Sequence, residues 1–261
     1  MSQDDFLLDI SEQIATITLN RPEKGNPMGI HFSQGFNAVL DRIEADPSVR
    51  CVIVTGQGRT FCGGGDLNEI MSPEPSDFEA EYKLVRGYNL LAKRLYYFDI
   101  PVIAAVNGPA VGGGVGIAMA CDFALASSTA RYDLFFQRVG LSAADVGVPW
   151  LLTRIVGASV ANYYLLTAGS IDAATGLRLG LFPEVVEPEK LLETARAAAK
   201  KIIDASEPSV RISKLALRHG VEMEFSANLE VEAYMQSYAF RTAEHKQRIA
   251  AYRDRVKKKG T

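Results

Sequence analysis

The chain has 261 residues, of which 48% are hydrophobic and 23% are charged, and its formal net charge is −3. This length and apolar content are enough for one substantial core with a small appended subdomain. The slight negative charge provides no overall positive field, so we expect neither nucleic acid nor an anionic membrane as a partner. The acidic start of the chain lacks a basic region followed by an apolar stretch, which predicts a cytoplasmic protein.

Neither the most apolar stretch nor the cysteines indicate a membrane span or a metal site. Residues 100–126 are interrupted by prolines, glycines and polar residues, so we expect a buried strand, a turn and a helix there. Cys51, Cys62 and Cys121 form no CxxC pair and stand in apolar or glycine-rich surroundings. This pattern favours reduced core thiols over disulfides and metal ligands.

Strand and helix patterns alternate along the first half of the chain. Short β-branched or apolar runs indicate buried strands, and apolar residues at helical spacing indicate helices between them. The alternation predicts an α/β fold of stacked β-β-α units. The expected strands are residues 14–19, 51–55, 102–106 and 123–126, and the expected helices are residues 31–45, 77–97 and 115–121.

The last third of the chain has the spacing of amphipathic helices. We therefore predict an α/β core over residues 1–190 and a helical carboxyl-terminal region over residues 191–261. The helices expected after the core strands are residues 149–156, 159–168, 173–179, 188–206, 210–220 and 229–257.

Two glycine-rich turns each follow an apolar strand, FCGGGDL at residues 61–67 and NGPAVGGG at residues 107–114. Because glycine has no Cβ, such turns let the backbone approach an anionic oxygen closely, and a helix amino terminus adds free N–H groups. Two N–H donors that converge on one carbonyl oxygen form an oxyanion hole, in which one donor contributes about 3 kcal/mol. The alternative is that both runs are only tight turns.

Other glycine-loop chemistries do not fit the spacing. The second run lacks the final glycine of a dinucleotide fingerprint, and the chain has no Walker loop, so NAD and ATP are not expected. Residues 140–144 lack the closing glycine of a nucleophile elbow, and there is no HExxH motif. Serine hydrolases and zinc enzymes are therefore disfavoured.

Five motifs follow one another along nearly the whole chain, namely NRPEKGNP at residues 20–27, FCGGGDL at 61–67, PVIAAVNG at 101–108, GGGVGIAMACD at 112–122 and the ending EHKQRIAAY at 244–252. In this order they resemble the signature of the enoyl-CoA hydratase/isomerase (crotonase) superfamily. The resemblance implies a crotonase-like (ClpP/crotonase) spiral of β-β-α units, with a helical carboxyl-terminal region that serves trimerisation and covers the active site. It also implies a homotrimer or hexamer, an acyl-CoA or enoyl-CoA substrate, no metal, and no cofactor beyond the coenzyme A of the substrate.

The resemblance assigns roles to residues by position. Gly65 and Gly113 become the two N–H donors of the oxyanion hole, which would hold the oxygen of a thioester enolate. Lys24 comes near the CoA phosphates, although a lysine in such a turn is by itself more often a solvated charge. Residues 71–88 would form the variable wall of the acyl pocket, unless their aromatic residues are helix core. The other residues expected along the bound thioester are Pro22, Gly63, Gly64, Asp66, Leu67, Val111, Gly112, Gly116 and Phe136, and Asp66 has a turn or capping role as its alternative.

Two positions depart from the hydratases of the family, which use two glutamates on one water. The resemblance places those glutamates at Gly116 and Phe136, and neither of these residues can transfer a proton. Losing each positioned acid or base lowers turnover ~100- to 10,000-fold, so ordinary hydration is disfavoured.

A carboxylate remains at Asp145, in a loop where several isomerases and dehalogenases of the superfamily carry their working acid. Asp145 resembles that residue. The alternative is that Asp145 caps the helix that begins near Val148, as aspartates often do.

Three functions follow from these residues. The first is an acyl-CoA isomerase or related lyase that holds an enolate on Gly65 and Gly113 and moves a proton with Asp145. The second is an enoyl-CoA hydratase with atypical water activation. The third is a non-catalytic subunit that binds CoA thioesters.

Overall fold

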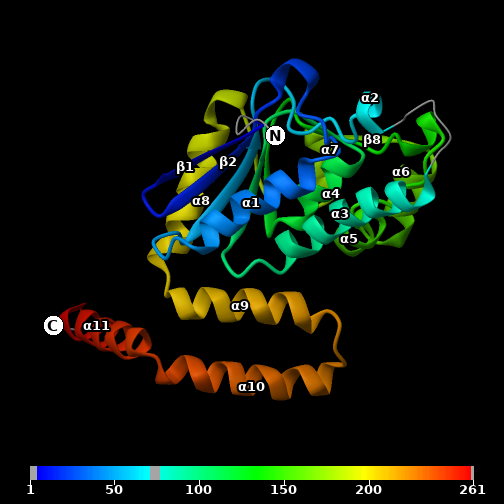
Figure 1. Ribbon diagram of the computed structural model, residues 1–261. Coiled ribbons are helices and arrows are strands. Elements are labelled where there is room, and N and C mark those ends of the chain that lie inside the picture. The colour runs from blue at the N-terminus through cyan, green and yellow to red at the C-terminus, as the bar shows by residue number, and fades with distance from the viewer. Residues whose placement is uncertain (1–4, 71–76, 260–261) are drawn as a thin grey trace. The chain divides into compact units, whose positions relative to one another are not determined.

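The computed structural model describes residues 5–70 and 77–259, without the side chains of residues 255–259 (Figure 1). The chain forms two compact units, Met1–Lys200 and Lys201–Thr261. The division after residue 190 and the role of the last region in trimerisation stay predictions.

A six-stranded sheet in the order β1-β2-β3-β4-β6-β9 runs through the first unit. β1 is antiparallel to β2, to which it is joined by a tight turn where Glu12 and Gln13 have φ of 51° and 65°. The other neighbours are parallel, and every residue of β3 and β4 is buried, which explains their nearly continuous apolar runs. The strands are β1 (Phe6–Ser11), β2 (Ile14–Leu19), β3 (Cys51–Gly56), β4 (Val102–Val106), β6 (Phe123–Ser127) and β9 (Val185–Val186).

The chain steps from this sheet into a second one of three strands, β5 (Pro109–Val111), β7 (Arg131–Asp133) and β8 (Ser170–Asp172). β5 follows β4 and precedes a helix, and β7 follows β6 in the same way, so the repeating unit is strand, strand and helix. β5 and β7 pair in parallel, and β8 is antiparallel to β7. The predicted spiral of β-β-α units is confirmed.

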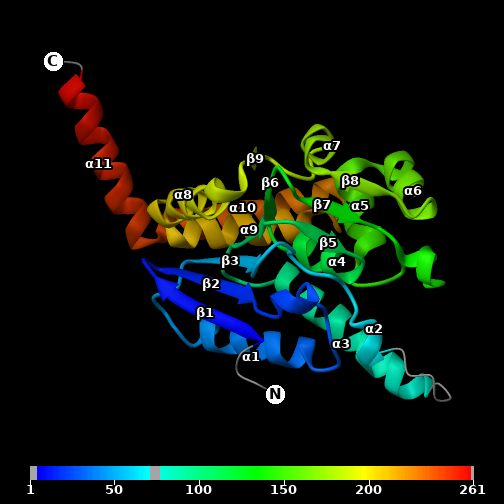
Figure 2. The ribbon, with the colours of Figure 1, turned by 90° about the horizontal axis from the view of Figure 1, so that it is seen from above.

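Helix α1 (Phe32–Glu44) and the start of α8 (Leu191–Asp204) cover opposite faces of the sheet at its β1 end (Figure 2). α1 buries Phe36, Leu40 and Ile43 in the core because its apolar residues recur at helical spacing. Arg196 of α8 ties this helix to β1, since its guanidinium lies 3.4 Å from Asp9 Oδ2.

Helix α4 (Gly113–Ala120) is buried along its whole length and packs against α3 (Phe78–Tyr96) and α5 (Val148–Val156). Its amino terminus, which carries the second glycine run, therefore lies inside the protein. Among the described residues, no helix is both long enough and apolar enough to cross a membrane. The remaining helices of the first unit include α2 (Leu67–Ile70), α6 (Ala158–Leu166) and α7 (Ala173–Arg178).

The second unit contains α9 (Glu207–Gly220), α10 (Phe225–Arg241) and α11 (Ala243–Lys259). The prediction of one helix over residues 229–257 is wrong, because α10 ends and α11 begins around Thr242. The Thr242 backbone is extended, with φ of −65° and ψ of 144°, and its Oγ1 accepts the His245 N–H at 3.2 Å. A threonine in this geometry caps a new helix.

Candidate active site

Backbone hydrogen bonds join the two glycine-rich turns. Phe61 N–H donates to Pro109 O at 3.0 Å and Val111 N–H donates to Cys62 O at 2.9 Å, so residues 61–62 run beside β5. A Cβ on Gly64 would lie 2.6 Å from Val111 O, and the φ of Gly64 is +79°. Only glycine permits this approach. The structure thus brings the two predicted glycine runs to one place.

A third segment holds the first glycine run from its other side. Met28 N–H donates to Gly64 O at 2.6 Å, and Asp66 N–H donates to Met28 O at 2.9 Å. This pairing uses the carbonyl and the N–H on either side of Gly65. Within residues 5–70 and 77–259 no partner is found for the N–H of Gly65 or of Gly113, the first residue of α4. Both predicted donors are available to a ligand.

A cavity of about 560 Å³, a size typical of small-molecule sites, opens at these turns. Most of its wall is apolar. Among the described residues that line it, Asp145 is the only carboxylate and Arg138 the only cation, with its guanidinium 3.6 Å from the centre of the Phe135 ring. The predicted site residues on the wall are Gly63, Gly64, Gly65, Leu67, Val111, Gly112, Gly113, Phe136 and Asp145.

Asp145 lies against the amino terminus of α4. Its Oδ2 is 3.1 Å from the position that a Cβ on Gly113 would take. The side chain is half-buried, and burial raises the pKa of the Asp145 carboxyl, against a smaller opposite effect of the Val146 N–H. The side chain does not cap α5, because Gly147 is the residue that precedes this helix and no side chain caps it. The carboxylate is therefore left for the cavity.

Gly116 and Phe136 supply no acid or base. A Cβ on Gly116 would lie 2.5 Å from Val146 O and 2.6 Å from Val146 Cβ, so no side chain fits there while the loop keeps its place. Gly116 is consequently not on the cavity wall in the described part of the chain. Phe136 is on the wall, 6% exposed, and its Cε1 lies 3.4 Å from the Cβ position of Gly112.

The family follows from similarity to known proteins. The family model described as enoyl-CoA hydratase/isomerase matches residues 9–259. The chain belongs to this family. It is 34% identical over 261 residues to the short-chain-enoyl-CoA hydratase of Clostridium acetobutylicum, across 100% of this chain and 98% of the relative. It is 30% identical over 250 residues to the 1,2-epoxyphenylacetyl-CoA isomerase of Escherichia coli, across 95% of both chains. The crystal structure of a probable enoyl-CoA hydratase/isomerase from Mycobacterium abscessus has a TM-score of 0.88 and 30% identity, covering 97% of this chain and 96% of that chain.

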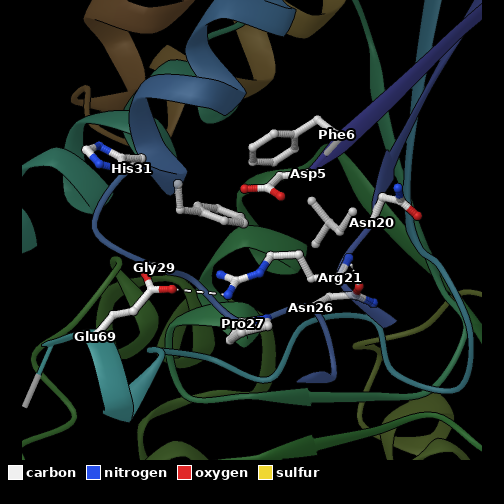
Figure 3. A pocket seen from close by; sticks show the side chains of 11 residues that line it. Asp5, Phe6, Asn20, Arg21, Asn26, Pro27, Gly29, His31 and Glu69 are labelled. Carbon is white, nitrogen blue, oxygen red and sulfur yellow. Dashed lines mark hydrogen bonds and ion pairs between the residues drawn. The ribbon is translucent and has the colours of Figure 1, made fainter. Parts of the chain in front are cut away.

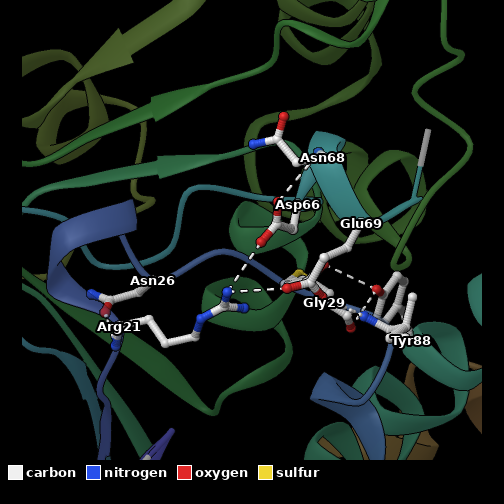
Figure 4. A network of polar contacts seen from close by, with 9 residues as sticks. Arg21, Asn26, Gly29, Asp66, Asn68, Glu69 and Tyr88 are labelled. Carbon is white, nitrogen blue, oxygen red and sulfur yellow. Dashed lines mark hydrogen bonds and ion pairs between the residues drawn. The ribbon is translucent and has the colours of Figure 1, made fainter. Parts of the chain in front are cut away.

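In this enoyl-CoA hydratase/isomerase family member, Arg21 fastens helix α2 beside the cavity (Figure 4). Its guanidinium lies 3.3 Å from Asp66 Oδ2 and 3.1 Å from Glu69 Oε1. Asp66 is 5% exposed and is not among the described residues of the cavity wall, so the structure places it in the ion pair. Ile70 of the same helix lies over Gly65, with its Cδ1 2.6 Å from the Cβ position of that glycine.

Pro22 and Lys24 lie in a short 3₁₀ turn (Pro22–Lys24) and do not line the cavity in the described part of the chain. Buried Asn26 anchors the turn, since its Oδ1 accepts the Arg21 N–H at 2.8 Å and its Nδ2 donates to Thr60 O at 2.7 Å. The turn is thereby fixed close to the first glycine run. Contact of Pro22 and Lys24 with coenzyme A stays a prediction.

A smaller cavity of about 180 Å³ adjoins the Arg21 network (Figure 3). Its polar wall includes Arg21, Asn26, His31 and Glu69. Because Arg21 is already neutralised by two carboxylates, this cavity offers a phosphate little net charge. The larger cavity is the candidate acyl-CoA site.

Residues of α3 complete the site, among them Tyr88, which belongs to the predicted wall. The Tyr88 hydroxyl donates to Gly29 O at 2.8 Å or to Met28 O at 3.0 Å, and burial, followed by the charge of Asp145, raises the pKa of Tyr88 and keeps it protonated. These partners are far apart along the chain, so no local pattern marks them. Of the predicted wall over residues 71–88, residues 71–76 lie outside the described residues, and Leu84, Val85 and Tyr88 line the cavity. Phe78 and Tyr82 are exposed, not helix core.

Proposed function

We propose that the protein stabilises a thioester enolate on the N–H groups of Gly65 and Gly113 and moves one proton with Asp145. The observation that carries this proposal is the position of Asp145, 3.1 Å from the Cβ position of Gly113 in a cavity whose described wall has no other carboxylate. One such group is enough for double-bond isomerisation, because the group that removes a proton from one carbon can deliver a proton to another.

The proposed reaction begins with the Asp145 carboxylate, which removes a proton from the α or γ carbon of an enoyl thioester. The electron pair of the broken C–H bond moves into the conjugated system and on to the thioester oxygen. The N–H groups of Gly65 and Gly113 donate to this oxygen and stabilise its charge. The half-buried Asp145 carboxylic acid exchanges this proton with solvent and then delivers a proton to the other end of the allylic system. A raised pKa of Asp145 suits this work, since it makes the carboxylate a stronger base.

The acyl-CoA is expected to enter along the loops that carry Pro22, Lys24 and the first glycine run. Its acyl group would lie between α3 and residues 136–145, where the described wall is mainly apolar. No metal and no cofactor beyond coenzyme A are required. A hydrophobic acyl group is therefore the proposed substrate class.

Hydration is a second candidate, favoured by the relative from Clostridium acetobutylicum, which is a short-chain-enoyl-CoA hydratase. Hydration needs a group that activates water and a group that protonates the α carbon. Gly116 and Phe136 offer neither group, so Asp145 would have to serve both steps. Isomerisation needs only one proton-transferring group, which Asp145 can supply.

Assembly into a homotrimer or hexamer in the cytoplasm is proposed as well. The second unit exposes many large apolar side chains, which association would bury. Light scattering tests this assembly, and a particle with the mass of one chain would refute it. The exposed residues include Leu217, Phe225, Tyr234, Tyr238 and Tyr252.

Incubation in deuterated water with crotonyl-CoA and with a 3-enoyl-CoA tests the reaction. Mass spectrometry should find deuterium at the α or γ carbon and conversion between the two thioesters. Addition of D2O, which places deuterium on the α carbon and an OD group on the β carbon, without conversion between the two thioesters would replace isomerisation with hydration. Binding of thioesters without any change would reduce the protein to a CoA-thioester binder.

A further inference from the structure

The loop that carries Asp145 has a strained backbone at the next residue. Val146 has φ of 47°, a left-handed conformation that β-branched residues rarely adopt. Gly147 follows with φ of 72°, and these two residues turn the chain from Asp145 into α5. Such strain persists only where the surrounding structure holds it.

Contacts on the Val146 side chain and on the Asp145 main chain hold part of this turn. The Val146 side chain is fully buried and packs on Gly116. Asp145 N–H donates to Ala143 O at 2.8 Å, and Asp145 O accepts the Val148 N–H at 2.9 Å. None of these contacts engages the N–H of Val146.

Asn89 provides the contact that completes the turn. Its Oδ1 accepts the Val146 N–H at 2.9 Å, from a position 57 residues earlier on α3. The hydroxyl of the preceding residue, Tyr88, donates to Gly29 O or Met28 O, in the segment that pairs with the first glycine run. Two consecutive residues of one helix thus fix the position of the Asp145 loop relative to the segment that pairs with the first glycine run.

We propose that Asn89 is a positioning residue, which holds Val146 in its left-handed conformation and so keeps the Asp145 carboxylate beside Gly113. This inference rests on the proposed function, because it needs Asp145 to be the base. Asn89 is not among the described residues of the cavity wall, so it acts through the loop and not on the substrate.

The test compares five variants by kcat, KM and pH profile. Asn89→Ala removes the acceptor, Asn89→Asp keeps an acceptor oxygen of the same shape, and Leu90→Ala is the matched control on the exposed side of the same helix. Asp145→Asn, alone and combined with Asn89→Ala, reports whether the effect passes through the base. Thermal denaturation shows whether each variant is folded.

Asn89→Ala should lower kcat about tenfold or more while KM changes little, since small displacements of a reacting group cost much turnover. Asn89→Asp should recover turnover at alkaline pH, with the acid limb of its profile moved to higher pH, because a second negative charge disfavours ionisation of Asp145. Leu90→Ala should match the wild type. In the Asp145→Asn background, Asn89→Ala should cause no further loss.

Two results overturn the inference alone. One is an inactive Asp145→Asn variant together with a fully active Asn89→Ala variant. The other is an equal loss from Asn89→Ala in the presence and absence of the Asp145 carboxylate. A fully active Asp145→Asn variant overturns the proposed function and this inference together, so the two failures are distinguishable.

Discussion

Asp145 Oδ2 lies 3.1 Å from the position that a Cβ on Gly113 would occupy. The same residue, Gly113, offers a backbone N–H with no partner in the described part of the chain. A carboxylate and an oxyanion donor therefore meet at one point of the cavity wall. Proton removal next to a carbonyl group needs this arrangement, because charge develops on the carbonyl oxygen as the proton leaves.

Gly113→Pro removes the N–H donor at the first position of α4, where the fixed φ of proline is tolerated. Turnover should fall by about 100-fold or more, the loss expected for one oxyanion donor. Gly113→Ala is the control. It adds the same Cβ, within 3.0 to 3.2 Å of Val146, Asp145 and Met28, and keeps the N–H. Equal kcat for the two variants would exclude a role for this N–H.

Asp145→Asn should raise stability at neutral pH. Burial raises the pKa of Asp145, so the folded state disfavours its charged form. The stability that such a group contributes is present below its unfolded pKa and is lost as pH rises through its folded pKa. At pH 7 the variant should therefore unfold at a temperature equal to or above that of the wild type, and near pH ~4 the difference should vanish. A lower unfolding temperature at pH 7 would show that the carboxylate stabilises the fold.

Gly116→Ala should destabilise the protein by about 1–3 kcal/mol, the usual cost of overpacking a core. The new Cβ would meet Val146 O at 2.5 Å, and displacing Val146 would also disturb Asp145. Gly87→Ala is the control, because its Cβ would meet only the Ser33 side chain, whose hydroxyl oxygen at 2.9 Å can rotate away and whose Cβ at 3.7 Å is in ordinary contact. Denaturant unfolding measures both. A Gly116→Ala variant as stable and active as the wild type would mean that the loop moves freely.

Arg21→Ala should destabilise the protein by about 3 kcal/mol, since it leaves the buried Asp66 carboxylate without its counter-ion. It should also free α2 and with it Ile70 from Gly65. Lys83→Ala is the control, because it breaks the ion pair between Lys83 and Glu79, whose two side chains are 70% and 74% exposed. It should change the free energy of unfolding by less than about 0.5 kcal/mol. Equal effects of the two substitutions on unfolding would argue against the network.

Local signals in the sequence predict the glycine runs of the site but not the long-range contacts that hold its loops. The first glycine run can be recognised in the sequence because Gly64 stands where only a missing Cβ permits the packing. The sequence marks Asp145 only as a candidate base, because its distance from Gly113 depends on how the loop folds. Asn89 reaches its partner across 57 residues, and no periodicity encodes such a contact. Thr242 carried a local signal for a helix start, which continuous helical spacing concealed.

Deuterium incorporation tests the assignment of Asp145 as the group that moves the proton. Its rate is measured side by side for the wild type and for Asp145→Asn, on one enoyl-CoA thioester in deuterated water. The wild type should place deuterium on the α or γ carbon. Asp145→Asn should still bind the thioester, but its rate of deuterium incorporation should be lower by ~100-fold or more, the loss expected for a missing acid–base group. Incorporation by Asp145→Asn at the wild-type rate would contradict the assignment of Asp145 as the group that moves the proton.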